Sequence, residues 1–335
     1  KKVARNIIKY FLSLVKMQSQ QATNFPLLYY IYVAVRRILH ITLIRINKWI
    51  VQSDRLFLSK QPGFHKILLV GDGFAEGLGD YVTIGTHSGV SHHMIKNIHE
   101  DKFVRQRWAI LNRGRAGAVT SDWIPTELDD QGSDGSKPKG KSFFNKVVES
   151  EACRNAAIVV ILMGTMDVVF QKIGMPLQAY KKSGELAPVY TEDEFCQTLR
   201  NIRSTAEAFR KMGKTVVVCD VITNGAGLDS HLGDIKRVNR QIRQYAKSTQ
   251  DEENPVKLVR LSNPVVERSL NRAFDGLHLN SKGYKALSKL IFEEVRADLI
   301  AEEVKVWKPM LFSCDSTPSG SAQKSSKSGL QKKKD

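Results

Sequence analysis

Residues 66–79 read KILLVGDGFAEGLG, an apolar stretch that runs directly into a glycine-rich turn. Short Val/Ile/Leu runs without polar alternation are typical of buried parallel strands, so residues 66–70 are predicted to form one. Glycines let a backbone turn sharply and approach a ligand closely. The turn that begins at Gly71 is therefore the first candidate functional site.

Similar apolar runs alternate with helical stretches along the rest of the chain. Further strands are predicted at residues 107–112, 156–164, 214–221 and 256–262. Helices are predicted at residues 88–100, 143–151, 191–211 and 229–249, and an amphipathic helix closes the pattern over 280–300. Strands that alternate with helices of ten or more residues predict an α/β fold whose parallel sheet is covered on both faces.

The positive charge lies mainly outside this region. The chain of 335 residues has a net charge of +17, and residues 1–58 hold ten Lys and Arg side chains but one acidic residue, Asp54. The body is thus only mildly basic and carries no nucleic-acid motif, so no nucleic-acid partner is expected. The cysteines lack disulfide or metal spacing, which favours a reducing compartment and predicts no metal and no cofactor (Cys153, Cys196, Cys219, Cys314).

Residues 1–58 predict a basic, amphipathic helical arm. Arg36 and Arg37 would lie near the centre of any membrane span, where a charged side chain costs about 2.5–3.5 kcal/mol. The pattern fits a helix that lies on a membrane surface. Packing against a protein partner, or against the domain itself, explains the same apolar face. We expect an intracellular, membrane-associated protein, and a basic start nearly free of acidic residues also fits an organellar one.

The composition divides the chain into three parts. The arm covers residues 1–58, a domain covers 59–312, and a Ser/Lys-rich tail that is predicted to be disordered covers 313–335. Within the domain, residues 126–142 form a polar insertion with glycines and a proline, which predicts a flexible surface loop.

One interpretation of the opening turn is a nucleotide loop. Gly71, Gly73 and Gly77 follow a strand, as glycines do where a pyrophosphate meets a helix N-terminus. The next predicted strand ends about 40 residues after Gly71, however, beyond the ~30 residues of such a unit. Nucleotide binding therefore stays a minor alternative.

A second motif lies just before the last helix. In DGLH, residues 275–278, Asp275 precedes His278 by three residues. On a loop, this spacing lets the carboxylate hold one ring nitrogen of the histidine, so that the other nitrogen is free to act as a general base.

Together these motifs resemble the SGNH (GDSL) hydrolases. Four blocks occur in the order of that family: GDGFAEGLG, NRGRAGAVT, GTMD and DGLH. The resemblance covers about residues 66–298 and implies a three-layer α/β/α, flavodoxin-like fold with a central parallel sheet of about five strands. It also implies roles for five positions. Gly73 stands at the nucleophile position, Gly117 and the Gly73 backbone would donate to an oxyanion, Met166 replaces an asparagine donor, and Asp275 with His278 forms the dyad.

Two departures from the family pattern bear on function. Glycine has no hydroxyl with which to form an acyl-enzyme, and a methionine thioether has no proton to donate. The leading hypothesis is a catalytically degenerate member that serves as a structural or accessory subunit, bound through residues 1–58 to a membrane or a membrane-associated complex. The alternative is an esterase or lipase-like enzyme that hydrolyses a small acyl ester with water activated by His278 and Asp275.

Other polar residues near the motifs carry weaker expectations. Ser88, Ser91 and Thr120 could replace the missing hydroxyl, although their spacing does not indicate it. His92 and His93 are adjacent, and since neighbouring helical side chains diverge, they predict a helix surface rather than a metal site. Asp167, from the third block, is expected to cap or hydrogen-bond locally.

Overall fold

The computed structural model describes most of the predicted domain and part of the arm. The described residues are 31, 34–36, 38–46, 65–80, 88–125, 142–170, 178–180, 186–188, 197–273 and 275–313. The predicted loop at 126–142, except residue 142, and the predicted tail beyond residue 313 lie outside them, as do the first 30 residues.

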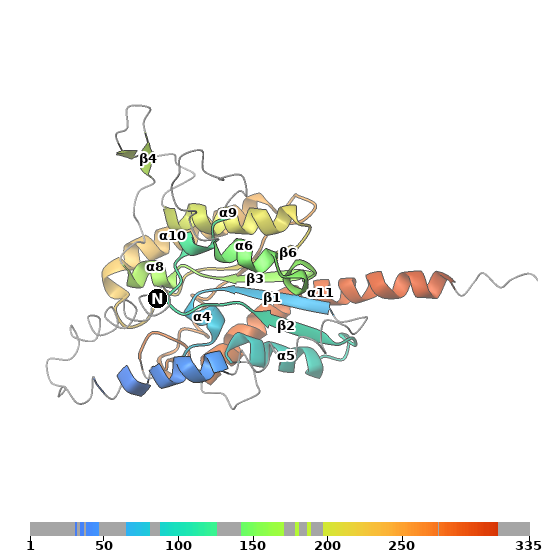
Figure 1. Ribbon diagram of the computed structural model, residues 1–335, viewed down its shortest axis with the longest axis horizontal. Coiled ribbons are helices and arrows are strands. Elements are labelled where there is room, and N and C mark those ends of the chain that lie inside the picture. The colour runs from blue at the N-terminus through green and yellow to red at the C-terminus, as the bar shows by residue number, and fades with distance from the viewer. Residues whose placement is uncertain are drawn as a thin grey trace, which may run out of the picture.

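A five-stranded parallel sheet forms the centre of the domain (Figure 1). Each strand falls on one of the apolar stretches, so the five strand predictions are confirmed. The strand order is β2-β1-β3-β6-β7, which is the flavodoxin-like order. The strands are β1 (His65–Gly71), β2 (Trp108–Asn112), β3 (Ile158–Leu162), β6 (Thr215–Cys219) and β7 (Lys257–Val259).

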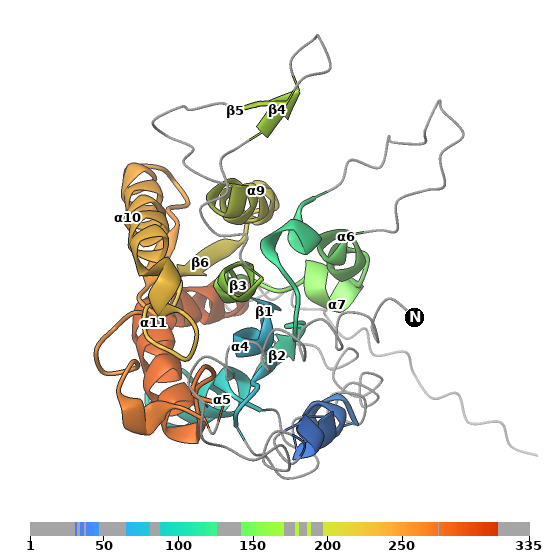
Figure 2. The same cartoon turned by 90° about the vertical axis from the view of Figure 1, so that its left-hand side faces the viewer.

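Helices cover both faces of this sheet, which confirms the three-layer arrangement (Figures 1 and 2). One face carries α5 (Val90–Glu100) and α11 (Ser281–Ser313). The other carries α6 (Phe143–Val148), α7 (Glu151–Arg154), α9 (Gln197–Lys211) and α10 (Leu232–Ser248). Every residue of β3 is buried, as expected for a central strand that is covered on both sides.

Short elements connect these layers. They are α4 (Gly73–Glu76), α8 (Thr165–Val169) and the 3-10 turns η1 (Thr120–Trp123), η2 (Asp229–His231) and η3 (Ser269–Asn271). Two short antiparallel strands, β4 (Gln178–Tyr180) and β5 (Leu186–Pro188), were not predicted. The predicted helix 143–151 is divided in two because Ser150 takes extended backbone angles before α7.

Part of the arm packs against the domain. Residues 38–46 are helical, and Ile41 and Ile44 are buried in the same hydrophobic core as the sheet. His40 is also buried, with Nε2 3.0 Å from the carbonyl oxygen of Asp80. Ile41, Ile44 and His40 are therefore buried by packing of the arm on the domain itself, one of the explanations offered for the apolar face of the arm.

A second apolar face of the same segment is exposed. Its spacing of i, i+4, i+7, i+8, i+12 and i+15 places these side chains on one side of a helix. They are Ile31, Val35, Ile38, Leu39, Leu43 and Ile46. Among the helices in the described part of the chain, none has the length and hydropathy needed to cross a membrane.

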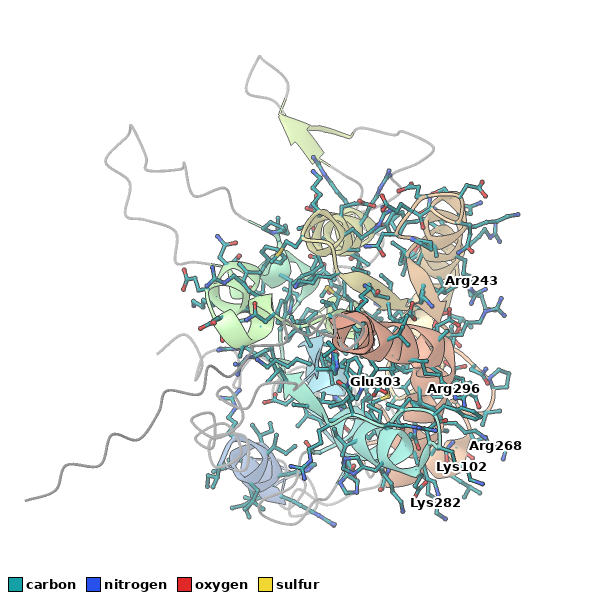
Figure 3. The ribbon with its side chains drawn as sticks, turned by 90° about the vertical axis from the view of Figure 1, so that its right-hand side faces the viewer. Lys102, Arg243, Arg268, Lys282, Arg296 and Glu303 are labelled. Carbon is teal, nitrogen blue, oxygen red and sulfur yellow. The ribbon has the colours of Figure 1, made fainter. Side chains whose placement is uncertain are left out.

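A buried carboxylate, Glu303, connects the C-terminal half of α11 to the segment before β2 (Figure 3). Its oxygens accept hydrogen bonds from the backbone N–H groups of Arg105 and Gln106 and from Trp108 Nε1, each at 2.9 Å. The segment that leads into β2 is therefore tied to α11 across 195 or more residues of sequence.

Replacing Glu303 is predicted to destabilise the fold. Glu303→Ala leaves the buried indole N–H of Trp108 and two partly buried backbone N–H groups without their acceptor, and should lower the free energy of unfolding by about 3 kcal/mol. Glu302→Ala, one residue away and less buried, is the control and should change it by less than about 0.5 kcal/mol. Urea denaturation measures both, and equal effects of the two variants would contradict the anchoring role.

Candidate active site

The first block forms a tight turn that connects β1 to α4 and packs against the end of β3. Gly71 has a φ of 140°, and a Cβ atom there would lie 1.6 Å from the carbonyl oxygen of Leu162. Only glycine fits where the strands approach so closely, and the N–H of Asp72 donates to that same carbonyl at 2.9 Å. Asp72 then caps α4 by accepting the Phe74 N–H at 2.9 Å.

The fourth block brings its dyad to this turn. His278 Nδ1 lies 2.7 Å from Asp275 Oδ2, and the other oxygen, Oδ1, accepts the N–H groups of Leu277 and His278. A buried carboxylate at this distance favours the tautomer in which Nδ1 carries the proton, because the carboxylate is an acceptor. Nε2 is then the unprotonated nitrogen, as a general base requires.

Nε2 points at position 73. An ideal Cβ built on Gly73 would lie 2.7 Å from His278 Nε2 and 2.9 Å from Leu78 Cδ1. Atoms do not approach a real Cβ this closely, so a serine at position 73 would require the imidazole and Leu78 to move. The histidine therefore occupies part of the space that a nucleophile side chain would need.

The dyad is enclosed by protein. The His278 side chain has no exposed surface, and its ring stacks on Phe74 with centroids 4.9 Å apart. Tyr284 at the start of α11 donates to the Leu78 carbonyl at 2.7 Å, which fixes the turn against the last helix. In this arrangement, the imidazole packs as a core residue while its base nitrogen faces the turn.

The second block packs against the first. The Arg115 N–H donates to the Gly71 carbonyl at 2.9 Å, and the Ala116 N–H donates to the buried carboxylate of Glu76. Asn112 Nδ2 donates to the Ala75 carbonyl at 2.8 Å. Gly117 lies in the same loop, buried and with a φ of 74°. The structure therefore brings the loop that holds the predicted oxyanion glycine to the turn.

The third block supplies packing and a long-range anchor. Met166 is fully buried in the core, where the resemblance places an amide donor. Asp167 accepts hydrogen bonds from the N–H and hydroxyl groups of Thr120 and from the hydroxyl of Thr198. The expectation of local bonds for Asp167 was wrong, since these partners lie 47 and 31 residues away and tie α8 to η1 and α9.

The hydroxyls considered as substitutes have other partners. Ser88 Oγ donates to the Glu76 carbonyl, Ser91 Oγ accepts from Asn112, and Thr120 donates to Asp167. None of these bonds involves His278. His92 is exposed, while the His93 side chain lies 3.1 Å from the Ser281 hydroxyl. Among the described residues, no cluster of three His, Cys, Asp or Glu side chains could hold a metal ion.

Close packing explains why glycine stands at the three positions that suggested a nucleotide loop. Gly71 meets Leu162, and Gly73 meets His278. Gly77 ends α4 with a φ of 91°, and a Cβ there would lie 2.6 Å from Ser88 Oγ. Protein atoms therefore occupy the space beside each of the three glycines, where a pyrophosphate would have to lie.

The strand order and the position of the four blocks are those of an SGNH hydrolase-like fold. The strand order matches the flavodoxin-like expectation, and the first three blocks follow the carboxyl ends of β1, β2 and β3. The fourth block joins them through the contact between His278 and position 73. The sequence predicted this convergence, but it did not predict that the imidazole would fill the space beside Gly73.

Comparison with known proteins gives matches in structure but not in sequence. No protein-family model matches the chain, and no curated protein matches it significantly. A family 3 carbohydrate esterase of Clostridium thermocellum has 16% identity and a TM-score of 0.48, over 72% of this chain and 99% of that one. A GDSL-like lipase of Bacteroides thetaiotaomicron has 17% identity and a TM-score of 0.45, over 74% and 98%. A lipase/acylhydrolase of Enterococcus faecalis has 14% identity and a TM-score of 0.44, over 70% and 96%.

Burial changes the ionisation of Asp72 in the turn. Complete burial raises its pKa from 3.8 to about 7, and the nearby charge of Asp167 acts in the same direction. The backbone N–H groups of Phe74, Met166 and Thr165 oppose this shift only in part. The sequence gives no signal for this change, since it depends on how deeply the turn is buried.

Asp72 is predicted to make stability depend on pH. Because its folded-state pKa lies above the unfolded value, the folded protein holds the proton more tightly, and stability falls as pH rises from about 4 to about 7. Asp72→Asn keeps an acceptor for Phe74 and removes the titration. Relative to this variant, the wild-type protein should lose roughly 2–3 kcal/mol between pH 5 and pH 8.

Urea denaturation at the two pH values measures the effect. The exposed Asp229, changed to Asn, is the matched control and should show no such pH-dependent difference from wild type. A constant gap between wild type and Asp72→Asn across this range would show that Asp72 is ionised in the folded state at pH 5.

Proposed function

We propose that the protein hydrolyses acyl esters with a water molecule that is activated by His278 and Asp275. The observation that supports this proposal is the orientation of the imidazole. Nδ1 is held 2.7 Å from the Asp275 carboxylate, and Nε2 faces the position where a nucleophile would be attached. A positioned base of this kind is what proton removal from a nucleophile requires.

The residues would act as follows. Nε2 accepts a proton from water while the water oxygen attacks the ester carbonyl, and Asp275 stabilises the imidazolium that forms. The backbone N–H groups of Gly73 and Gly117 are the candidate donors to the oxyanion. The imidazolium then protonates the leaving alkoxide, which releases an alcohol and a carboxylic acid. Since Met166 supplies no donor, we expect turnover about 10²–10³-fold below that of a site with a complete oxyanion hole.

Substrate access follows from the enclosure of the dyad. Because the His278 side chain has no exposed surface, the side chains around the turn must shift before an ester carbonyl can come within reach of Nε2. This favours small acyl groups and slow turnover. A site of this kind retains about 10³–10⁴-fold acceleration over water without its nucleophile.

Hydrolysis of short-chain 4-nitrophenyl esters tests this proposal. Wild-type protein should exceed the buffer rate, and His278→Ala should return it to the buffer rate, a loss of at least about 10²-fold. His92→Ala, which removes an exposed histidine, is the control and should leave the rate unchanged. Without a nucleophile hydroxyl no acyl-enzyme forms, so a fluorophosphonate should not label the protein.

Two results would overturn the proposal. One is a wild-type rate equal to buffer, and the other is a rate that His278→Ala leaves intact. Fluorophosphonate labelling of a serine would instead show that another hydroxyl replaces the missing nucleophile.

A second candidate function is an accessory subunit that is held at a lipid surface by the arm. The absent hydroxyl at position 73 and the buried Met166 favour this role, because both remove catalytic groups. The exposed apolar face of residues 31–46 also favours it, since six large apolar side chains lie on one side of a helix. Arg36 is exposed beside this face, and residues 1–58 have a large excess of positive charge, which would attract anionic lipids.

Co-sedimentation with vesicles tests this role. The full chain should bind phosphatidylcholine vesicles that contain phosphatidylserine, and Leu39→Asp/Leu43→Asp should weaken binding at least about 10-fold, since each buried leucine contributes about 1.5–3 kcal/mol. Leu270→Asp replaces a leucine on the body that is 80% exposed and should have no effect. Equal binding of both variants, or no binding by the wild type, would exclude a lipid-binding role for this face.

A further inference from the structure

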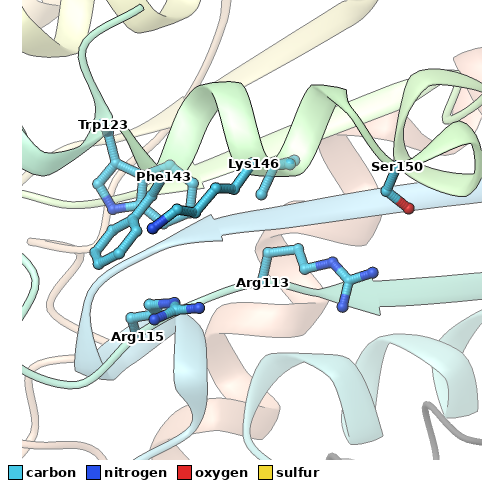
Figure 4. Close-up of a pocket in the computed structure, with 7 residues that line it drawn as sticks. Arg113, Arg115, Trp123, Phe143, Lys146 and Ser150 are labelled. Atoms are coloured by element: carbon cyan, nitrogen blue, oxygen red, sulfur yellow. The ribbon is translucent and has the colours of Figure 1, made fainter. Parts of the chain in front are cut away.

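A pocket on the β2 side of the domain is lined by hydrogen-bond donors and aromatic rings. It has a volume of about 280 Å³, enough for roughly nine water molecules at ~30 Å³ each. Figure 4 shows side chains from the loop after β2 facing those of η1 and α6. The lining residues are Arg113, Arg115, Trp123, Phe143, Lys146, Val147 and Ser150.

Three of these residues carry positive charge, and none carries negative charge. Among the described residues, no carboxylate forms an ion pair with Arg113, Arg115 or Lys146. The two acidic groups that act on Arg115 are engaged elsewhere. Glu76 accepts the Ala116 N–H, and Asp122 accepts the Val119 N–H.

One aromatic ring and one sulfur atom contact these cations where counter-ions are absent among the described residues. The Arg115 guanidinium lies 4.4 Å from the centroid of the Phe143 ring, and Lys146 Nζ lies 5.7 Å from it. Such cation–π contacts orient a cation without neutralising it. Arg113 Nε donates to Cys153 Sγ at 3.3 Å, which leaves the terminal nitrogens of its guanidinium for another acceptor.

An unpaired donor lies in the same pocket wall. Trp123 is completely buried, and its Nε1–H has no hydrogen-bond partner within the described part of the chain. Its ring packs against Phe143 with centroids 5.6 Å apart. Buried indole N–H groups ordinarily have a partner, and leaving one unpaired costs about 1–3 kcal/mol.

Electrostatics favours the entry of an anion here. Partial burial of its guanidinium lowers the pKa of Arg115, and repulsion by Arg45 and Arg113 lowers it further. Glu76 and Asp122 oppose these effects only in part. A negative charge in the pocket would relieve this repulsion and would supply acceptors to the indole N–H and to the Ser150 hydroxyl.

We propose that this pocket binds a phosphate group. A phosphate presents several acceptor oxygens and up to two negative charges, and arginine binds it in bidentate fashion while lysine acts as a point charge. The pocket is larger than one phosphate, so the ligand is a phosphate monoester, either a soluble metabolite or the headgroup of an anionic lipid. This site is independent of the dyad and of the proposed ester hydrolysis.

Calorimetric titration of the full chain with inorganic phosphate and with glycerol 3-phosphate tests the proposal. Wild-type protein should bind with a submillimolar Kd at low salt. Lys146→Met keeps the apolar stem over Phe143 but removes the charge, and should weaken binding at least about 10-fold. Trp123→Phe keeps a ring but removes the N–H, and should weaken binding about 5-fold.

Two controls isolate the pocket from general charge effects. Lys102→Met removes an exposed lysine elsewhere on the surface (Figure 3) and should leave the Kd within about 2-fold of wild type. Thermal unfolding of the ligand-free variants checks folding, and since Lys146 is itself exposed, Lys146→Met should fold normally.

Vesicles distinguish the two sources of the phosphate. If wild-type protein binds phosphatidic acid vesicles but neither soluble phosphate, and Lys146→Met weakens the vesicle binding, the ligand is a lipid headgroup. Binding to the soluble phosphates assigns it to a metabolite. The proposal is overturned if wild-type protein binds none of these probes, or if Lys146→Met binds them as tightly as wild type does.

Discussion

The contact between His278 and position 73 is the constraint that shapes the site. A side chain at position 73 would lie 2.7 Å from Nε2, so the buried position of the imidazole requires glycine there. The same contact connects the first and last blocks of the domain, more than two hundred residues apart. Phe74, in the same turn, stacks on the imidazole.

This constraint explains why the site combines two opposed features. The Asp275–His278 pair has the orientation of a catalytic base, yet it is as well packed as the hydrophobic core around it. In this protein the imidazole is fully buried against the turn, so any chemistry depends on how readily the side chains around it shift.

Local patterns in the sequence predicted the strands and the dyad. Buried strands are indicated by apolar runs such as residues 66–70, and the spacing of Asp275 and His278 indicates a dyad once it is combined with the glycine-rich turn at residues 71–79. Features that depend on distant partners could not be predicted. Glu303 reads as one acidic residue on a helix, but it is the acceptor for three donors around the start of β2. Likewise, Asp167 bonds to Thr120 and Thr198 rather than locally.

The pocket shows the same limit of sequence patterns. Arg113 and Arg115 stand two residues apart in the chain, but Phe143, Lys146 and Ser150 come from beyond a polar segment of sixteen residues, 126–141. No spacing rule joins these groups, because the fold alone places α6 beside the loop after β2. The apolar face of residues 31–46 differs in this respect, since helical spacing makes it visible in the sequence.

Helix α11 runs along the whole domain, from the loop that holds His278 to the segment before β2. It begins three residues after His278, at the carboxyl edge of the sheet, and reaches Glu303 at the opposite edge, about 33 Å further on at 1.5 Å per residue. The helix then continues past the body of the domain to Ser313 (Figure 1). A partner that binds the C-terminal end of α11 would therefore contact the same continuous helix whose first residue follows His278 by three positions.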